Sequence, residues 1–356
     1  MLPYWIFFAV PALAALATGP AMRVRDDRAR PIEMNSTWLL ILLILTVLIG
    51  FRYEVGGDWA NYLRYITRAY SLDFADLRTL DDPGYWALNI LSLTLGFGMT
   101  GVNTLGAFIF SIGLVVFCRS TPRPWLALAC AQPYLVTVVA MGYTRQSIAL
   151  GLAMIGLVML GRGRFVVFIV WVLLGALFHK TAVMLLPIAA FSSSRNRWLS
   201  LGIIISATLL GYKVLLEDSA VHLVQTYTDQ SIASSGALVR LSMNLLPAIL
   251  FLFYRYRFLI AASERNLWSV FSLLAVGMFV VFFPSNLSTP LDRLALYVLP
   301  LQLTVFSHLP DALGVFGKRN QVVIFAILIY YALAMYVWLN FAVHSRYWVP
   351  YQLGVA

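Results

Sequence analysis

Five ionisable side chains lie at the boundaries of apolar stretches in this sequence and could do chemistry there. Asp58 and His179 are possible general bases, and Arg52, Arg145 and Arg293 are cations with fixed charge. A guanidinium group offers two parallel donors to a phosphate and stays charged at any working pH. Three such groups near one membrane interface suit a pyrophosphate, whose departure they assist by neutralising its developing charge without any metal. Asp58 or His179 would then deprotonate an acceptor hydroxyl.

Some of these residues also have structural interpretations, which compete with the chemical one. Arg52 is placed to anchor the end of a span, with its charged group in the interface. Gly56-Gly57-Asp58 is typical of a turn followed by a helix cap, and His179-Lys180 of an interfacial anchor. Chemistry is favoured because all of them are expected at the same membrane face, where each ionisable group costs roughly 2.5–3.5 kcal/mol.

Acidic residues provide a structural alternative for the later arginines. Arg145 and Arg293 could pair with Asp58 or Asp292 as ion bridges across a helical bundle. The stretch Asp81-Asp82-Pro83-Gly84 offers two neighbouring carboxylates, which could suggest a metal. The proline and glycine that follow them favour a tight turn instead.

The elements that must position these residues are membrane-spanning helices. Of the 356 residues, 61% are hydrophobic and only 11% are charged, and the mean hydropathy is +0.83. Several runs of roughly 17–20 apolar residues match the length that crosses about 30 Å of hydrocarbon. The sequence therefore predicts an all-α integral membrane protein, with residues 1–356 as a single membrane domain of about twelve spans. The expected spans are 3–19, 36–51, 102–118, 124–141, 146–161, 164–179, 181–191, 198–214, 238–254, 267–284, 293–309 and 321–340.

Three further segments are expected near the outer interface. The stretch 84–99 is apolar, but a full crossing there would invert every later loop, so we expect a re-entrant or interfacial segment. Residues 52–83 are expected to form the longest extracytoplasmic loop. Tyr347-Trp348 at a span end are typical of an aromatic belt.

The positive charge is concentrated in alternate loops. These loops hold 15 of the 25 basic residues and only five of the 15 acidic ones, so they contain the whole net charge of +10. Short basic loops are cytoplasmic in multi-pass proteins, which predicts that both termini are periplasmic. The basic excess is thus a topology signal and a contact for anionic membrane lipids, and the loops lack the interleaved aromatics that would bind nucleic acid.

Several enzyme classes are disfavoured by what the sequence lacks. It contains no Gly-Lys-Ser/Thr phosphate loop, no Gly-x-Ser-x-Gly elbow and no acidic cluster for a metal on the cytoplasmic side. The two cysteines, Cys118 and Cys130, predict neither a disulfide nor a metal site. We therefore expect no cofactor, and no nucleotide-driven reaction.

The chemically interesting residues fall in a series of short motifs, and in that series the chain resembles the EpsG family of Wzy-like polymerases. The resemblance extends from about residue 52 to residue 297, in matching order, with one departure: Asp82 replaces a glutamate, which keeps a carboxylate but shortens its reach. The motifs are Arg52-x-x-x-Gly56-x-Asp58-x-x-x-Tyr62, Asp82-Pro83-Gly84-Tyr85, Arg145-Gln146-x-x-Ala149, Phe178-His179-Lys180 and Arg293-x-x-x-Tyr297.

This resemblance implies a glycosyltransferase that moves glycan chains between undecaprenyl-pyrophosphate-linked repeat units at the periplasmic leaflet of a bacterial inner membrane. It also implies a GT-C-like helical architecture. A chain-length regulator is a further candidate partner. The expected roles are pyrophosphate binding by the three arginines, acceptor activation by Asp58 or His179, and support by the remaining motif residues: Tyr62, Gln146, Lys180 and Tyr297.

Two other functions stay open from the sequence. The first is an O-antigen-type ligase, which moves a finished glycan onto another acceptor by the same chemistry. The second is a flippase or secondary transporter, which about twelve spans would suit. Transporters usually show internal repeats and ionisable sites near the midplane, whereas here the charges lie at span ends and no repeat is apparent.

Overall fold

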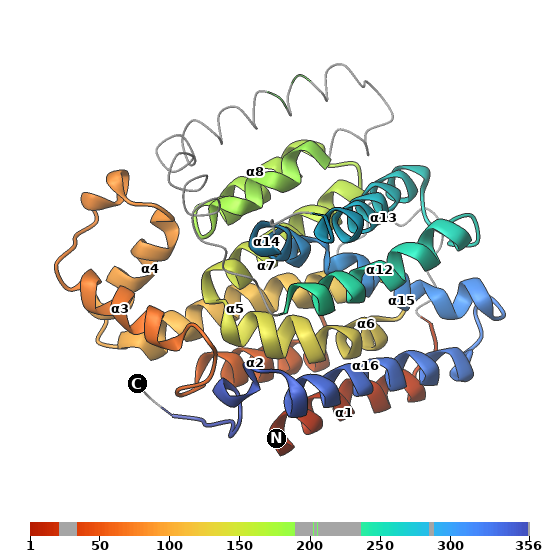
Figure 1. Ribbon diagram of the computed structural model, residues 1–356, viewed down its shortest axis with the longest axis horizontal. Coiled ribbons are helices and arrows are strands. Elements are labelled where there is room, and N and C mark those ends of the chain that lie inside the picture. The colour runs from red at the N-terminus through yellow and green to blue at the C-terminus, as the bar shows by residue number, and fades with distance from the viewer. Residues whose placement is uncertain (21–33, 189–201, 203–204, 206–235, 285–287, 355–356) are drawn as a thin grey trace.

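The computed structural model describes residues 1–20, 34–188, 202, 205, 236–284 and 288–354 (Figure 1). Within these residues the chain is helical, and extended pairing is limited to one isolated bridge between Arg52 and Leu353. The longer helices are α1 (Leu2–Ala17), α2 (Ser36–Gly50), α3 (Trp59–Ala69), α4 (Pro83–Thr94), α5 (Gly98–Arg119), α6 (Pro124–Ala131), α7 (Thr144–Gly161), α8 (Phe165–Ala176), α12 (Ala237–Tyr254), α13 (Ala262–Phe282), α14 (Ser288–Val298), α15 (Pro300–Leu313) and α16 (Gln321–Phe341). Shorter pieces are η2 (Asp76–Thr79), the π-helix η3 (Gln132–Ala140), η4 (Lys180–Leu185) and η5 (Ser345–Tyr347).

Five of these helices are long and apolar enough to cross a membrane: α5, α7, α12, α13 and α16. Four shorter apolar helices accompany them in the described part of the chain, namely α1, α2, α8 and the continuous stretch Pro124–Ala140. The expected all-α membrane class is therefore confirmed, whereas the count of twelve spans and the GT-C-like arrangement stay predictions. The predicted span 198–214 lies outside the described residues apart from isolated positions, and 181–191 lies partly outside them.

The predicted span 293–309 is wrong as a single helix. The structure divides this segment at Pro300, with α14 ending at Val298 and α15 beginning at the proline itself. Proline lacks the N–H that would continue the helical hydrogen bonds, and its ring clashes with the preceding turn. As a result α14 is a short helix of 11 residues, and it carries Arg293 in its middle.

Glycines bring α5 and α7 into close contact at the centre of the bundle. A Cβ atom added to Gly113 on α5 would lie 2.0 Å from the carbonyl oxygen of Gly151 on α7. In the reverse direction, a Cβ at Gly151 would lie 2.7 Å from the Cα of Phe110. Close backbone approach through small residues is a common means of helix association in membranes. It sets the position of α7, whose first turn carries Arg145.

We expect Gly113→Ala to lower the free energy of unfolding by about 1–3 kcal/mol, because the added methyl group overpacks the α5–α7 contact. The matched control is Gly277→Ala on α13, where an added Cβ would meet no atom within 4 Å. That control should be neutral or slightly stabilising, since alanine is the better helix former. Thermal melting of the purified variants in detergent measures both effects, and equal melting temperatures would contradict the close packing.

Basic loops meet at the end of the bundle opposite the motif residues. Arg123 pairs with Asp311 at 2.7 Å, and the same guanidinium donates to the carbonyl oxygens of Lys318 and Arg319. Arg123 lies in the loop before α6, and the other three residues lie at the connection between α15 and α16, so two loops meet here. The charge distribution predicts that both loops lie at the same membrane face, and their contact is consistent with that prediction.

Helices α3 and α4 project from one end of the bundle, at the left of Figure 1. The predicted loop 52–83 thus contains a helix, α3, whose buried side chains include Tyr62 and Ile66. Helix α4 has 12 residues and extends about 18 Å, well short of the roughly 30 Å of a full crossing. This length agrees with a re-entrant or interfacial segment over 84–99.

The C-terminal segment is fastened across the end of α2. Tyr53 donates its backbone N–H to Gln352, and Gly354 donates to the carbonyl oxygen of Phe51. Trp348 is buried, and its ring nitrogen donates to the carbonyl oxygen of Thr137 in η3 at 2.7 Å. The aromatic-belt interpretation is therefore wrong for Trp348, because this side chain packs inside the bundle.

Candidate active site

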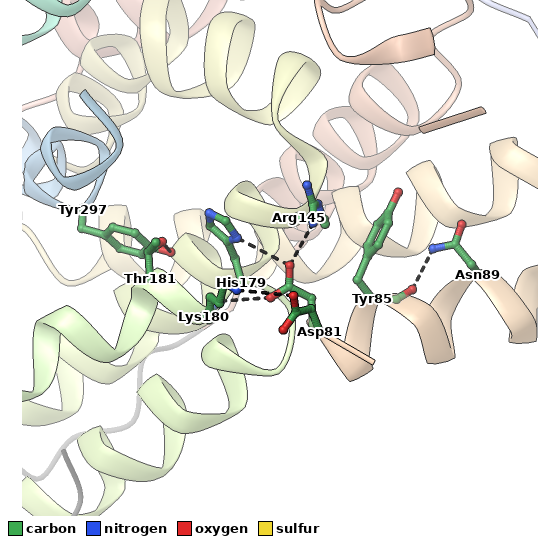
Figure 2. Close-up of polar contacts among 9 residues, drawn as sticks. Asp81, Tyr85, Asn89, Arg145, His179, Lys180, Thr181 and Tyr297 are labelled. Carbon is green, nitrogen blue, oxygen red and sulfur yellow. Dashed lines mark hydrogen bonds and ion pairs between the residues drawn. The ribbon is translucent and has the colours of Figure 1, made fainter. Parts of the chain in front are cut away.

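Asp82 is the hub of the polar cluster at the motif end of the bundle. Its carboxylate accepts a hydrogen bond from the Arg145 guanidinium at 2.9 Å and another from the Lys180 backbone N–H at 3.1 Å. The Nδ1 atom of His179 lies 3.7 Å from the same carboxylate (Figure 2). Asp82 thus connects three motifs that are far apart in the sequence.

The backbone holds Asp82 in place. The residue adopts a left-handed conformation, with φ 54°, which aspartate tolerates better than most side chains. Two residues later, Gly84 donates its N–H to the carbonyl oxygen of Leu177 at 2.8 Å, and a Cβ at Gly84 would lie 3.0 Å from that oxygen. The turn 81–84 is therefore docked against the loop that follows α8.

Asp82 is an anion in this environment. Burial alone would raise the pKa of the carboxyl, but the nearby His179 ring, the charge of Arg145 and the hydrogen bond from the Lys180 N–H outweigh it. The pKa of Asp82 consequently lies below its usual value. A carboxylate this well bound supplies a fixed negative charge next to His179.

His179 is buried, with 8% of its surface exposed, and it ends the helical run of α8 in an extended conformation. Neither ring nitrogen has a partner within hydrogen-bond distance among the described residues. Burial lowers the pKa of His179, with Arg145 and Arg293 acting in the same direction and Asp82 opposing them. A neutral imidazole is the form that can accept a proton.

Arg145 lies in the first turn of α7. Its guanidinium carbon is 4.7 Å from the ring centre of Tyr65 and 5.9 Å from that of Tyr85. These rings and Asp82 orient the group, yet 27% of the side chain remains exposed. Arg145 can therefore contact a ligand without losing its supports.

Arg293 reaches the same cluster from α14. Its guanidinium forms no hydrogen bond or ion pair with any residue that the structure describes, and its backbone carbonyl accepts from the Gln146 side chain at 3.1 Å. The charge of Arg293 acts on both Asp58 and His179. Gln146 thus holds α14 against α7, and Arg293 presents an uncommitted cation.

Tyr297 lies one turn beyond Arg293 on α14 and is fully buried. Its hydroxyl oxygen accepts a hydrogen bond from Thr181 at 3.2 Å (Figure 2). Lys180, next to Thr181, reaches Asp81 with its ammonium group at 3.4 Å. These contacts fix the loop after α8 against α14 on one side and against the 81–84 turn on the other.

Asp58 joins the cluster from the start of α3. It is half-buried and accepts a hydrogen bond from the Asn61 amide at 3.2 Å. Burial raises the pKa of Asp58, against the opposing effects of Asn61, Arg293 and Arg145. This loop comes close to the backbone of Met141 at Gly56, whose φ is +113°. A Cβ atom added to Gly56 would lie 2.3 Å from the Met141 carbonyl oxygen, so other residues are excluded there.

Arg52 serves the scaffold. The side chain is 2% exposed, and its guanidinium donates to four protein acceptors. These acceptors are the carbonyl oxygens of Ile49 and Val55 and the side chains of Asn103 and Thr144. Because four of its five N–H donors are bound within the protein and the residue is buried, Arg52 stabilises the scaffold around the cluster.

Sequence reasoning missed two features of this region. Asp82 was interpreted only as part of a tight turn, although it lies at the centre of the polar cluster. The Asp-Pro-Gly-Tyr motif was the available signal for this role. Arg240 was not singled out, and it pairs with Asp292 at 2.5 Å and hydrogen-bonds Tyr134. Asp292 is therefore bound to Arg240, and Arg145 has Asp82 as its partner.

Metal ligands are not grouped in this region. Among the described residues, no three His, Cys, Asp or Glu side chains are close enough together to form a ligand set. The polar groups that converge are instead two arginines, one histidine and two carboxylates. This composition favours binding an anion next to a general base.

Fold and site together define a helical membrane protein with a cluster of arginine, histidine and carboxylate side chains at one end of the bundle. The chain belongs to the EpsG family, whose model matches residues 35–353, which confirms the resemblance seen in the motifs. This is a family of Wzy-like polymerases of polysaccharide synthesis, and membership implies a lipid-linked oligosaccharide substrate. No curated protein and no solved structure matches the chain.

Proposed function

We propose that this protein is a glycosyltransferase that polymerises oligosaccharide repeat units carried on undecaprenyl pyrophosphate. The observation that carries the proposal is the convergence of Arg145 and Arg293 on one site that also holds Asp58 and His179. Two fixed guanidinium groups suit a pyrophosphate, because each supplies paired donors and a permanent charge.

In the proposed reaction, an acceptor hydroxyl on one repeat unit attacks the anomeric carbon of the donor glycan. The new glycosidic bond forms as the bond from that carbon to the pyrophosphate oxygen breaks. The leaving pyrophosphate takes the electron pair, and Arg145 and Arg293 neutralise its charge. Asp58 or His179 accepts the hydroxyl proton, while Tyr62, Gln146, Lys180 and Tyr297 support the groups that react.

The charge placement needs no metal in this proposal. We expect the purified protein, incubated with a lipid-linked repeat unit and excess EDTA, to give a ladder of polymers at an unchanged rate. Separation of the products by gel electrophoresis measures the ladder, and added Mg²⁺ serves as the control. A ladder that disappears with EDTA and returns with Mg²⁺ would contradict the metal-independent mechanism.

The cellular product separates a polymerase from a ligase. Cells that lack a polymerase accumulate single lipid-linked repeats, whereas cells that lack a ligase accumulate long lipid-linked polymer. We propose the first outcome for this protein, at the periplasmic leaflet of a bacterial inner membrane with both termini periplasmic. Labelling of an Asp81→Cys variant by a membrane-impermeant reagent tests this orientation, and labelling from the cytoplasmic side alone would overturn it.

A further inference from the structure

We propose that Asp82 is a positioning residue that orients His179 as the base for the acceptor hydroxyl. This inference rests on the proposed function and goes further, because it selects His179 over Asp58 and gives Asp82 a role in the chemistry. It is drawn from the contacts of the 81–84 turn with the loop after α8.

The first step is the immobility of Asp82. Each carboxylate oxygen is bound, one by the Lys180 N–H and the other by Arg145, and the side chain is 4% exposed. The backbone hydrogen bond from Gly84 to Leu177 fixes the distance between the turn and the loop that carries His179. Asp82 therefore cannot move away from the imidazole without breaking contacts with two other segments.

The second step concerns the two ring nitrogens. Nδ1 faces the Asp82 carboxylate at 3.7 Å, and a hydrogen bond forms if the ring moves closer by about 0.5–1 Å. A proton on Nδ1 leaves the lone pair on Nε2, the ring nitrogen that is not engaged with Asp82. Nε2 is buried and has no hydrogen-bond partner within the described parts of the chain. A bound acceptor hydroxyl would supply that partner.

The third step is the charge balance. When the acceptor oxygen bonds to the anomeric carbon, its proton passes to Nε2 and His179 becomes an imidazolium ion. Asp82 stabilises this new positive charge, since its pKa is low enough to keep it ionised. The pair of electrons released at the anomeric carbon leaves with the polyprenyl pyrophosphate, against Arg145 and Arg293.

Asp58 is less suited than His179 to act as the general base. Its carboxylate already accepts a hydrogen bond from Asn61, whereas both ring nitrogens of His179 are without a hydrogen-bond partner in the described part of the chain. An imidazolium ion, unlike a protonated carboxyl, is positively charged and is stabilised by a neighbouring carboxylate. His179 has such a partner in Asp82.

The test is Asp82→Asn, with the rate of polymer formation measured as a function of pH. Asparagine has nearly the same shape, can accept from the Lys180 N–H and tolerates the left-handed backbone, so the fold should persist. We expect the plateau rate to fall by about 100-fold, because the imidazolium loses its counter-charge.

The acidic limb of the profile should also move. The charged and titratable groups that act on His179 are Asp82, Arg145 and Arg293, with Lys180 adjacent in the chain. Asp82 is the one that raises the pKa of His179, so its neutralisation lowers that pKa. The limb, where activity is lost as the base becomes protonated, should then shift to lower pH by roughly one unit or more. A plateau that falls without this shift would mean a merely structural role and would overturn the proposal.

Asp73→Asn is the matched control, because it makes the same change on an exposed carboxylate between α3 and η2, where asparagine can still accept from the Ala75 N–H. It should retain the wild-type profile. Asp82→Glu, which keeps the charge, should recover more activity than Asp82→Asn and keep the limb near its original pH. The acidic limb should be absent from the pH profile of His179→Gln. If it is absent from the profile of Asp58→Asn instead, Asp58 is the base.

These results separate the inference from the function on which it rests. If the wild-type protein forms no polymer from lipid-linked repeats, the proposed function fails. If it forms polymer and both His179→Gln and Asp82→Asn keep the wild-type profile, only the roles of these two residues fail. Melting temperatures of all variants identify any loss that reflects unfolding.

Discussion

Replacing Arg293 by alanine should reduce polymer formation by about 100- to 1,000-fold, because a fixed cation at the leaving group stabilises charge that develops in the transition state. The folded protein should be unaffected, since the guanidinium has no ion pair or hydrogen bond among the described residues. A polymerisation assay beside a thermal melt gives both quantities. Arg293→Lys should recover only part of the rate, because an ammonium group cannot make paired donations to a phosphate.

Arg78→Ala is a suitable control for this experiment. Arg78 is an exposed arginine in η2, between α3 and α4, so its removal changes the net charge equally without touching the cluster. It should leave the rate nearly unchanged. An Arg293→Ala protein that is folded and forms polymer at the wild-type rate would remove the anion site on which the proposed function depends.

Replacing Arg52 by methionine should have its largest effect on stability, with a loss of about 3–5 kcal/mol. The side chain is buried, and its loss leaves the carbonyl oxygens and the side chains of Asn103 and Thr144 without their donor. Chemical denaturation in mixed micelles measures the free energy of unfolding, with Arg78→Met as the surface control. An Arg52→Met protein of normal stability that no longer binds the donor would instead place Arg52 in contact with substrate.

Much of the cluster was predictable from the order of the chain in the membrane. Basic loops at one face require the intervening loops to meet at the other, so Asp58, Arg145, His179 and Arg293 were expected at one end before any contact was known. In the structure, Arg145 and Arg293 are near enough to both Asp58 and His179 for their charges to act on each. The alternation of loops does not show how deeply a side chain is buried. Arg52 was therefore expected in the cluster, although it is buried among groups of the scaffold.

The hub role of Asp82 could not be derived from local sequence. Asp-Pro-Gly is a strong turn signal by itself, and nothing near it indicates that Arg145 and His179 lie opposite. Those contacts depend on how α7 and α8 pack against the α4 region, which is set by close helix approach at Gly113, Gly151 and similar positions. Tertiary packing decided the role of a residue whose local conformation was correctly predicted.

The break at Pro300 was equally hidden. Proline is tolerated within membrane helices because neighbouring groups can satisfy the freed carbonyl oxygens, so hydropathy alone does not predict a helix end there. Trp348 shows a related limit of pattern reasoning. A tryptophan at a span end is usually interfacial, and only its hydrogen bond to Thr137 and its packing near Gly142 reveal that it is internal.

The pairing of Arg52 with Leu353 has a consequence for biogenesis. The loop that begins at Arg52 emerges early during translation, whereas the segment that clasps it, residues 347–354, is made about 300 residues later. At roughly 5–20 residues per second, that interval lasts roughly 15–60 s on the ribosome. Throughout it the Asp58 loop lacks its final neighbours. The newly inserted helices therefore stay incompletely packed until residues 347–354 have been made. A tag fused close to residue 354 would interfere with this last packing step.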